Sequence, residues 1–209
     1  MKGIFRLLRP KSIPEAGEER LDSMMFSTAF SELGVDANLL VPWEARAIEV
    51  GASRLSPGRG TKLLQGLWAK DKHMRQIDGD AIQRMERFFD FATVVANRDI
   101  IRQDEYGNFM VVVLSGSVAI DRVQPWGERL RLAEAAPGEI LGEMSLLDSG
   151  MRFSVCTTMS VCEIAVLSAE AMDEMLNAYP ALAASLIALL ARKLSLRLRV
   201  VSARLSDKK

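Results

Sequence analysis

The sequence predicts an α+β protein that is mainly β: a sandwich or barrel of about eight short strands, flanked by helices and followed by one long C-terminal helix. Three observations support this class. Residues 93–167 alternate short β-rich runs with turn residues. Helical spacing returns after Ser168. A chain of 209 residues can bury a sizeable core without disulfides or a structural metal.

Residues 1–60 have mixed character, with short apolar pieces and a break at residues 56–60, where Ser-Pro-Gly-Arg-Gly stands. We interpret them as a helical N-terminal extension that ends in a linker. Trp43 and Trp68 are expected to anchor this region against the β domain. The domain itself is assigned to residues 61–209, and a short amphipathic helix is expected at residues 81–89.

The β region contains seven runs rich in β-branched and aromatic residues, each bounded by residues that favour turns. The expected strands cover residues 93–95, 99–102, 109–114, 117–123, 130–134, 153–158 and 163–167. Seven or eight short strands at this spacing are typical of a sandwich or barrel.

Two helices follow, at residues 169–177 and 180–205, and Pro180 suits the first turn of the second. Apolar residues recur along the long helix at steps of three or four: Leu186, Leu190, Leu194, Leu198, Val201 and Leu205. A helix of about 25 residues spans about 37 Å, more than one face of a small domain can cover. We therefore expect a homodimer through residues 180–205, related by a two-fold axis.

Composition excludes several classes of protein. The 27 basic and 27 acidic residues cancel, so the chain as a whole has no electrostatic bias toward nucleic acid or anionic membrane. Apolar runs are too short for a membrane span, which needs about 18 residues or more. Cys156 and Cys162 are expected to be small core side chains, which fits a reducing cytoplasm. No metal-ligand set, acid/base pair or activated nucleophile can be assembled, so we expect no enzyme and no cofactor.

One segment has neither strand nor long-helix spacing. Residues 138–154 hold three glycines, one acid in an apolar setting, Glu143, and one arginine, Arg152. Backbone N–H groups of a turn near Gly142 and the planar fork of an arginine suit a phosphate. A carboxylate suits a sugar hydroxyl instead, as acids grip ribose in dinucleotide folds. The segment therefore predicts a site for a ribose and its phosphate.

This segment resembles the phosphate-binding cassette of the cyclic nucleotide-binding domain family, with Gly-Glu followed nine residues later by arginine. Turns at Gly107-Asn108, Gly116, Trp126-Gly127, Pro137-Gly138 and Tyr179-Pro180 also fall where the family has them. The resemblance covers residues 80–204 and is greatest to sensor domains of the catabolite activator type. It implies a jelly-roll-like double-stranded β-helix.

Carried over to this chain, the resemblance implies that Glu143 holds the ribose 2′-hydroxyl and Arg152 the cyclic phosphate. Gly142 and the amides of Met144 and Ser145 would form the rim. Ile120 and Leu132 would be apolar walls.

The chain departs from the family where a small or hydroxyl residue usually follows the arginine, because Phe153 stands there and Ser154 comes one step later. Phe153 has three interpretations: stacking on a base, tilting into the core, or filling the pocket. Arg197 falls where activator-like proteins reach the base. It either contacts guanine or is simply solvated.

The expected function is a cyclic nucleotide sensor that signals through its C-terminal helix to an unidentified protein partner. Cyclic AMP is the first expectation, with cyclic GMP and cyclic di-GMP left open. The alternative is a degenerate fold without ligand, acting as a dimeric scaffold. Activator-like transcription factors continue into a helix-turn-helix domain, whereas this sequence ends shortly after the long helix, so we expect no direct DNA binding.

Overall fold

Two antiparallel sheets form the centre of the computed structural model, which describes residues 24–70 and 79–206. The five-stranded sheet has the order β1-β2-β9-β4-β7 and the four-stranded sheet the order β3-β8-β5-β6. Their bounds are β1 Ser53–Arg54, β2 Asp90–Val94, β3 Asp99–Ile101, β4 Phe109–Ser115, β5 Val118–Val123, β6 Arg129–Ala135, β7 Ile140–Leu141, β8 Val155–Thr158 and β9 Cys162–Ser168.

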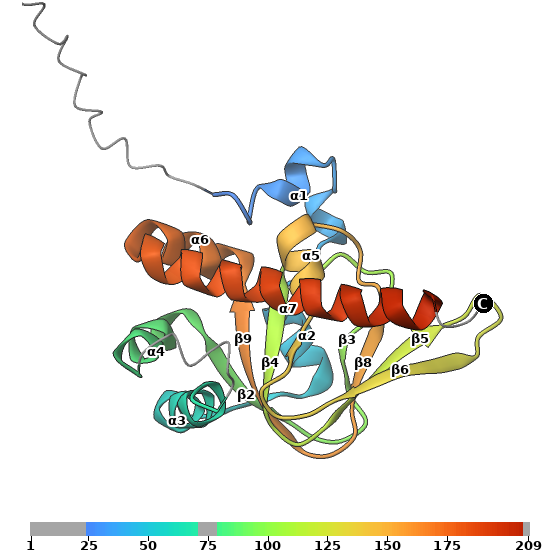
Figure 1. Ribbon diagram of the computed structural model, residues 1–209, viewed down its shortest axis with the longest axis horizontal. Helices are drawn as coiled ribbons and strands as arrows, with labels where there is room; N and C mark the ends of the chain where they lie inside the picture. Colours follow the sequence, from blue (N-terminus) through green and yellow to red (C-terminus); the bar gives the residue numbers. More distant parts are fainter. Residues whose placement is uncertain (1–23, 71–78, 207–209) are drawn as a thin grey trace, which may run out of the picture.

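Most of the helices cover the outer face of the five-stranded sheet, and the longest of them, α7, runs across the molecule (Figure 1). Their bounds are α1 Ala29–Glu32, α2 Trp43–Val50, α3 Pro57–Trp68, α4 Gly79–Met85, α5 Glu143–Asp148, α6 Ala169–Ala178 and α7 Pro180–Ser206, with 3₁₀ turns at Ala37–Leu39 and Glu86–Phe88. The helix α2 packs instead against the layer between the two sheets. No helix among the described residues combines the length and the apolar character that crossing a bilayer requires.

The predicted fold class is confirmed, and the structure adds the exact strand bounds and two further short strands. Each of the seven expected strands is present with ends shifted by a few residues. Two strands of two residues, β1 and β7, have no sequence signal because they are too short to show alternation. Across residues 24–70 and 79–206 the strands pair into two open sheets, so of the expected sandwich or barrel the structure shows a sandwich.

The linker expected at residues 56–60 is not present. Pro57 begins α3, as proline can at a first helical position, and Leu55 just before it donates from N to the carbonyl O of Phe91 at 3.0 Å. A Cβ at Gly60 would lie 2.1 Å from the Phe91 ring, so this glycine permits close helix–sheet packing. Residues 1–23, the first part of the predicted extension, lie outside the described residues.

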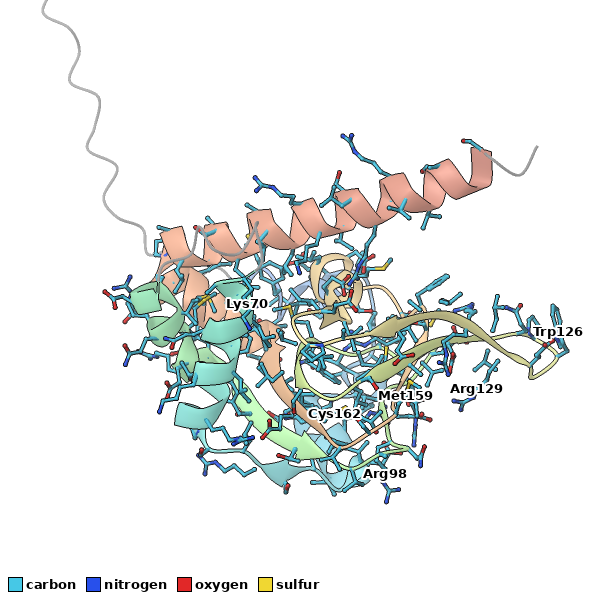
Figure 2. The ribbon with its side chains drawn as sticks, turned by 60° about the horizontal axis from the view of Figure 1, so that its bottom comes forward. Lys70, Arg98, Trp126, Arg129, Met159 and Cys162 are labelled. Carbon is cyan, nitrogen blue, oxygen red and sulfur yellow. The ribbon has the colours of Figure 1, made fainter. Side chains whose placement is uncertain are left out.

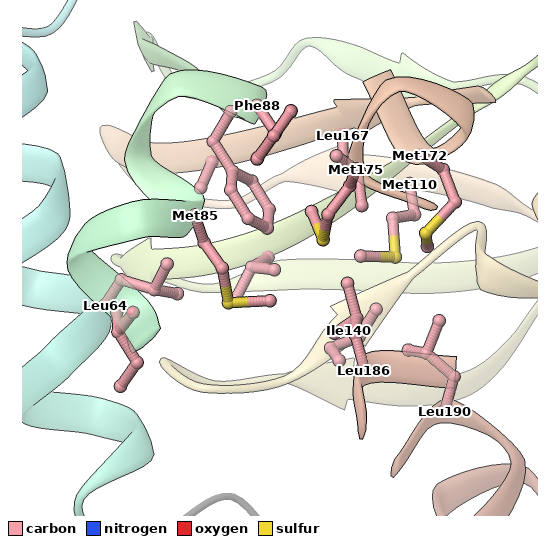
Figure 3. Packing of buried hydrophobic residues seen from close by; sticks show 14 of the residues in the cluster. Leu64, Met85, Phe88, Met110, Ile140, Leu167, Met172, Met175, Leu186 and Leu190 are labelled. Carbon is pink, nitrogen blue, oxygen red and sulfur yellow. The ribbon is translucent and has the colours of Figure 1, made fainter. Parts of the chain in front are cut away.

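Strand β4 divides the core into two layers. Met110, Val112 and Leu114 face α3, α4, α6 and α7, whereas Phe109, Val111 and Val113 face the other sheet, as the two-residue period of a strand requires. Figure 3 shows the helix-side layer, where methionines of β4, α4 and α6 meet leucines of α3 and α7. The predicted anchoring role of the two tryptophans is confirmed: Trp43 packs edge-on against Phe109 and Trp68 against Phe89.

The apolar stripe of α7 changes its environment halfway along the helix. Leu186 and Leu190 are fully buried in the helix-side layer. Leu198 is 67% exposed and Val201 52% exposed, where the helix runs on past the sheets toward the β5–β6 hairpin (Figure 1). That hairpin projects from the body and carries the exposed Trp126 at its tip (Figure 2). The side chain of Leu205 lies outside the described set.

Candidate functional site

A cavity of about 260 Å³, here called the cassette cavity, lies between β5, β6, β7, α5 and the segment before β8. All ten residues expected at the site line it: Ile120, Leu132, Gly142, Glu143, Met144, Ser145, Arg152, Phe153, Ser154 and Arg197. Residues from five separate parts of the chain therefore meet at one place, which the sequence alone could not show.

The turn into α5 depends on a glycine. Gly142 caps the helix with φ 75°, in the left-handed region, and a Cβ there would lie 2.5 Å from Nη1 of Arg152. A side chain at this position would displace the arginine. Ser145 is buried in the first turn of α5 and Met144 is half-exposed at the cavity.

Arg152 is only 3% exposed and has its charge inside the protein. Nη1 donates to the carbonyl O of Gly142 at 2.7 Å and Nη2 to that of Phe109 at 2.5 Å, while the guanidinium lies over the Phe109 ring. Burial lowers the pKa of Arg152 to about 10, so the group stays protonated at pH 7. Among the described residues no carboxylate lies within ion-pair distance of it. The result is a buried cation that contacts two carbonyl oxygens and an aromatic ring but makes no direct ion pair with a described carboxylate.

Glu143 is also buried, at 4% exposure, but it pairs with a different arginine. Nη1 of Arg197, on α7, donates to Oε1 of Glu143, and Nη2 donates to the carbonyl O of Ile140 at 3.0 Å. Burial raises the pKa of Glu143, and the positive charge of Arg197 partly opposes this shift. Arg197 thus links α7 to the cassette while its side chain is 45% exposed, and its contact with a base stays a prediction.

Phe153 stands at the rim of the cassette cavity and is 57% exposed. Arg122 of β5 lies over its ring, 4.7 Å from the ring centroid, and donates to the carbonyl O of Phe153. The ring therefore neither tilts into the core nor fills the cavity. Stacking of this ring on a base stays a prediction.

The walls include residues that sequence reasoning did not single out: Ile101, Ala133, Leu141 and Cys156. Three of them lie on predicted strands, and inward-facing alternation was the available signal. Leu141 lies on β7, which is too short to show such alternation in the sequence. Burial raises the pKa of the Cys156 thiol to about 12, which makes it an apolar wall rather than a nucleophile.

A second, larger cavity of about 340 Å³ lies between α2, β1, the start of α3 and β2; we call it the α2–β2 cavity. Its charged residues are Glu44, Arg54 and Asp90, all exposed. Burial, with a smaller effect from Glu44, raises the pKa of Asp90, while Arg54 lowers it. Within the described ranges, no three His, Cys, Asp or Glu side chains are grouped so as to hold a metal ion.

Comparison with known proteins finds similarity to cyclic nucleotide-binding proteins over part of the chain. The sequence model of the cyclic nucleotide-binding domain matches residues 92–179. The cyclic AMP receptor protein of Thermus thermophilus is 36% identical over 97 residues, which are 46% of this chain and 45% of that protein. A CRP-like cAMP-activated global transcriptional regulator of Mycobacterium tuberculosis is 28% identical over 95 residues, 46% of this chain and 42% of the relative. The matched region thus spans less than half of each curated relative.

Solved structures agree on the fold. A cyclic nucleotide-binding domain from Methylobacillus flagellatus has a TM-score of 0.68 at 20% identity, covering 76% of this chain and 89% of that one. The c-di-GMP responsive global regulator CLP of Xanthomonas campestris has a TM-score of 0.56 at 25% identity, covering 62% of this chain and 63% of that one. These likenesses show a shared architecture around the cassette cavity.

Proposed function

We propose that the chain is a regulatory protein that binds a cyclic nucleotide in the cassette cavity. The proposal starts from the match of residues 92–179 to the cyclic nucleotide-binding domain. The observation that carries this proposal is Arg152, a buried and protonated arginine without an ion-pair partner among the described residues, which lines the same cavity as the buried Glu143. An anion bound there offsets the desolvation of the guanidinium.

The chemistry of each side chain determines which part of the nucleotide it is proposed to contact. A guanidinium has five N–H donors, and Arg152 uses one from each of two nitrogens for carbonyls, so donors remain for a phosphate. Glu143 is an acceptor when ionised and suits the ribose hydroxyl. Ile120, Leu132 and the Phe153 ring then enclose the base.

The cavity favours a mononucleotide. Its volume of about 260 Å³ lies slightly below the usual range of ligand pockets, ~300–1,000 Å³. Cyclic AMP is our first candidate because the relatives from Thermus and Mycobacterium are named for it. Cyclic GMP follows, and cyclic di-GMP, for which the Xanthomonas regulator is named, is the least compatible with this volume.

Helix α7 is the proposed route of the signal. A ribose hydroxyl competes with Arg197 for Glu143, so binding of the nucleotide alters the contact that holds α7 against the cassette. A partner protein that touches the exposed end of α7 would sense this change. No reaction is catalysed in this scheme.

The alternative function is a scaffold without ligand, and one observation favours it: Glu143 already has a partner in Arg197. Calorimetry decides between the two. Full-length protein, unfolded, dialysed and refolded to remove bound small molecules, is titrated separately with cyclic AMP, cyclic GMP and cyclic di-GMP. Saturable binding of a mononucleotide supports the sensor; absence of heat with all three leaves the scaffold.

We also propose that the chain is a homodimer through α7. Leu186 and Leu190 are already buried in the core of the same chain. The apolar residues of α7 that remain available for a dimer interface are therefore at its exposed end, with Leu198 and Val201. Replacing Leu194 and Leu198 with glutamate should yield a monomer, because two carboxylates would face their symmetry mates and roughly 2 kcal/mol of burial per leucine would be lost. Sedimentation velocity measures this. A wild-type monomer at micromolar concentration, or a dimeric double variant, contradicts the interface.

A further inference from the structure

Arg46 on α2 is buried although it lies outside the segment that matches the family. It is 1% exposed, and its Nη1 and Nη2 donate to the carboxylates of Glu49 and Glu105. Its Nε is buried and lacks a hydrogen-bond partner among the described residues. A buried arginine whose pairing is incomplete is costly, so its retention calls for a role beyond packing.

Glu105 connects Arg46 to the cassette. Its carbonyl O accepts from the N–H of Arg152 at 2.8 Å, and the carbonyl O of Arg152 accepts from the N–H of Asp104 at 2.8 Å. The loop between β3 and β4 therefore holds the backbone of Arg152 on both sides. A Cβ at Gly107, in the same loop, would lie 2.8 Å from Nε of Arg152, so the loop also supports the side chain.

The N-terminal extension fixes this loop at a second point. Val41 N donates to the carbonyl O of Tyr106 at 2.8 Å, and Leu40 and Tyr106 form an isolated bridge. Between α2 and the cassette remains a cavity of about 10 Å³, the size of about one water molecule, lined by both Arg46 and Arg152. Arg152 thus forms a wall between this small cavity behind it and the cassette cavity in front.

The electrostatics fit this arrangement. Burial is the main cause of the lowered pKa of Arg152, the charge of Arg46 adds to it, and the charge of Glu105 opposes it. The Glu105 carboxylate pairs through Oε2 with Arg46 and lies 3.9 Å through Oε1 from Nη1 of Arg102, and it makes no ion pair with the guanidinium of Arg152. The fork of Arg152 then remains available to a phosphate at the front.

We propose that Arg46, acting through Glu105, is a positioning residue for the arginine of the nucleotide site, and that the N-terminal helix α2 thereby sets the affinity of that site. This inference rests on the proposed function. It also makes α2 a point of regulation: by linkage, any partner that moves α2 changes nucleotide affinity, and the nucleotide changes the affinity for that partner by the same factor.

The test compares Glu105→Gln with Glu49→Gln in the full-length chain. Both substitutions remove one carboxylate from the same Arg46 guanidinium, but Glu49 belongs to α2 itself and lines neither cavity beside Arg152. Arg46→Met is a third variant, and Arg46→Lys tests rescue by a conserved charge. Circular dichroism and thermal melts establish which variants are folded at the temperature of the titrations.

The expected result is that Glu105→Gln and folded Arg46→Met weaken cyclic AMP binding about tenfold or more, whereas Glu49→Gln stays within about twofold of wild type. Arg46→Lys should recover part of the loss. Combining Arg46→Met with Glu105→Gln should cost no more than the worse single change, as expected for one shared interaction. A purely structural role would lower the melting temperature of all variants without this pattern of affinities.

Amide hydrogen exchange gives a readout without ligand. The N–H groups of Asp104 and Arg152 should exchange faster in Glu105→Gln than in Glu49→Gln, because only the former loosens the loop. If the wild-type chain binds none of the three nucleotides, the proposed function fails and this inference with it. If it binds and Glu105→Gln matches Glu49→Gln in both affinity and exchange, only this inference is overturned.

Discussion

The two cavities of this protein differ in how deeply their charged residues are buried, and their volumes do not show this difference. The α2–β2 cavity is the larger, about 340 Å³ against about 260 Å³. Its charged residues, Glu44, Arg54 and Asp90, lie at the surface in contact with water. The cassette cavity instead has an acid and a base, Glu143 and Arg152, that are almost fully buried.

This difference is our reason for proposing the cassette cavity as the nucleotide site, because a buried charge costs far more free energy than an exposed one. A folded chain retains two desolvated, opposite charges on one cavity only if something there offsets their cost. In the cassette cavity Glu143 pairs with Arg197, whereas Arg152 contacts two carbonyl oxygens and the Phe109 ring without a direct ion pair among the described residues. In our proposal an anionic ligand supplies the missing negative charge.

The largest expected effect is from Arg152→Ala. Losing the charged hydrogen bonds to the phosphate, and leaving that phosphate unpaired, should weaken cyclic AMP binding by about 100-fold or more. The matched control is Asp90→Asn, which removes a charge from the α2–β2 cavity and should leave the affinity unchanged. Calorimetry on both variants measures the comparison. Equal losses, or a loss only in the Asp90 variant, would place the ligand elsewhere.

Glu143→Gln should weaken binding by a smaller factor, about tenfold, because the amide oxygen still accepts from a ribose hydroxyl but lacks the charge. The same substitution removes the ion pair to Arg197, so the end of α7 should become more mobile. Titration gives the affinity and hydrogen exchange along α7 gives the mobility. An affinity as low as that of Arg152→Ala would contradict the assignment of the ribose hydroxyl to Glu143 and the phosphate to Arg152.

Phe153→Ser tests the mouth of the cassette cavity. Since the ring is exposed, with Arg122 over it, and does not fill the cavity, its loss should cost stacking and weaken binding about three- to tenfold. The change in affinity for cyclic AMP is the measured quantity. Tighter binding in this variant would show instead that the ring obstructs the ligand.

The smallest effect concerns pH. Because burial raises the pKa of Glu143 above its ordinary 4.5, the folded state holds this proton more tightly than the unfolded chain does. Its contribution to the free energy of unfolding is therefore fully present below pH 4.5 and is lost as the pH rises through the folded pKa. Denaturant titrations across this range should show the difference in free energy of unfolding, wild type minus Glu143→Gln, falling as pH rises. A difference that grows with pH would mean that the Arg197 pair outweighs burial.

The elements of the fold were predictable where the chain repeats a pattern. The strand Phe109–Ser115 is a continuous run of apolar, mostly β-branched residues, and the helix Pro180–Ser206 has apolar residues at helical spacing, so each segment indicates its own secondary structure. The start of α3 was not predictable, since Ser-Pro-Gly-Arg-Gly favours a turn in isolation. There, packing of Gly60 under Phe91 overrides local preference. The two-residue strands exist only through their partners in the sheet.

The site was predictable as a set of residues but not as a set of contacts. The residue types of the segment 138–154 and its resemblance to the family's cassette indicated Gly142, Glu143 and Arg152. These signals could not show that Arg197 would reach Glu143 across 54 positions of sequence, or that Arg46 would lie behind Arg152, because both contacts depend on how helices pack onto the sandwich. Long-range ion pairs leave no local signature in a single sequence.

The most direct test of the central claim is a crystal structure of the full-length chain grown with 8-bromo-cyclic AMP, with bromine located by its anomalous scattering. The account predicts a single bromine peak in the cassette cavity near Leu132 and Phe153, with the phosphate against Arg152 and the ribose against Glu143. A peak in the α2–β2 cavity, or crystals without bromine from protein that binds the nucleotide in solution, would contradict it.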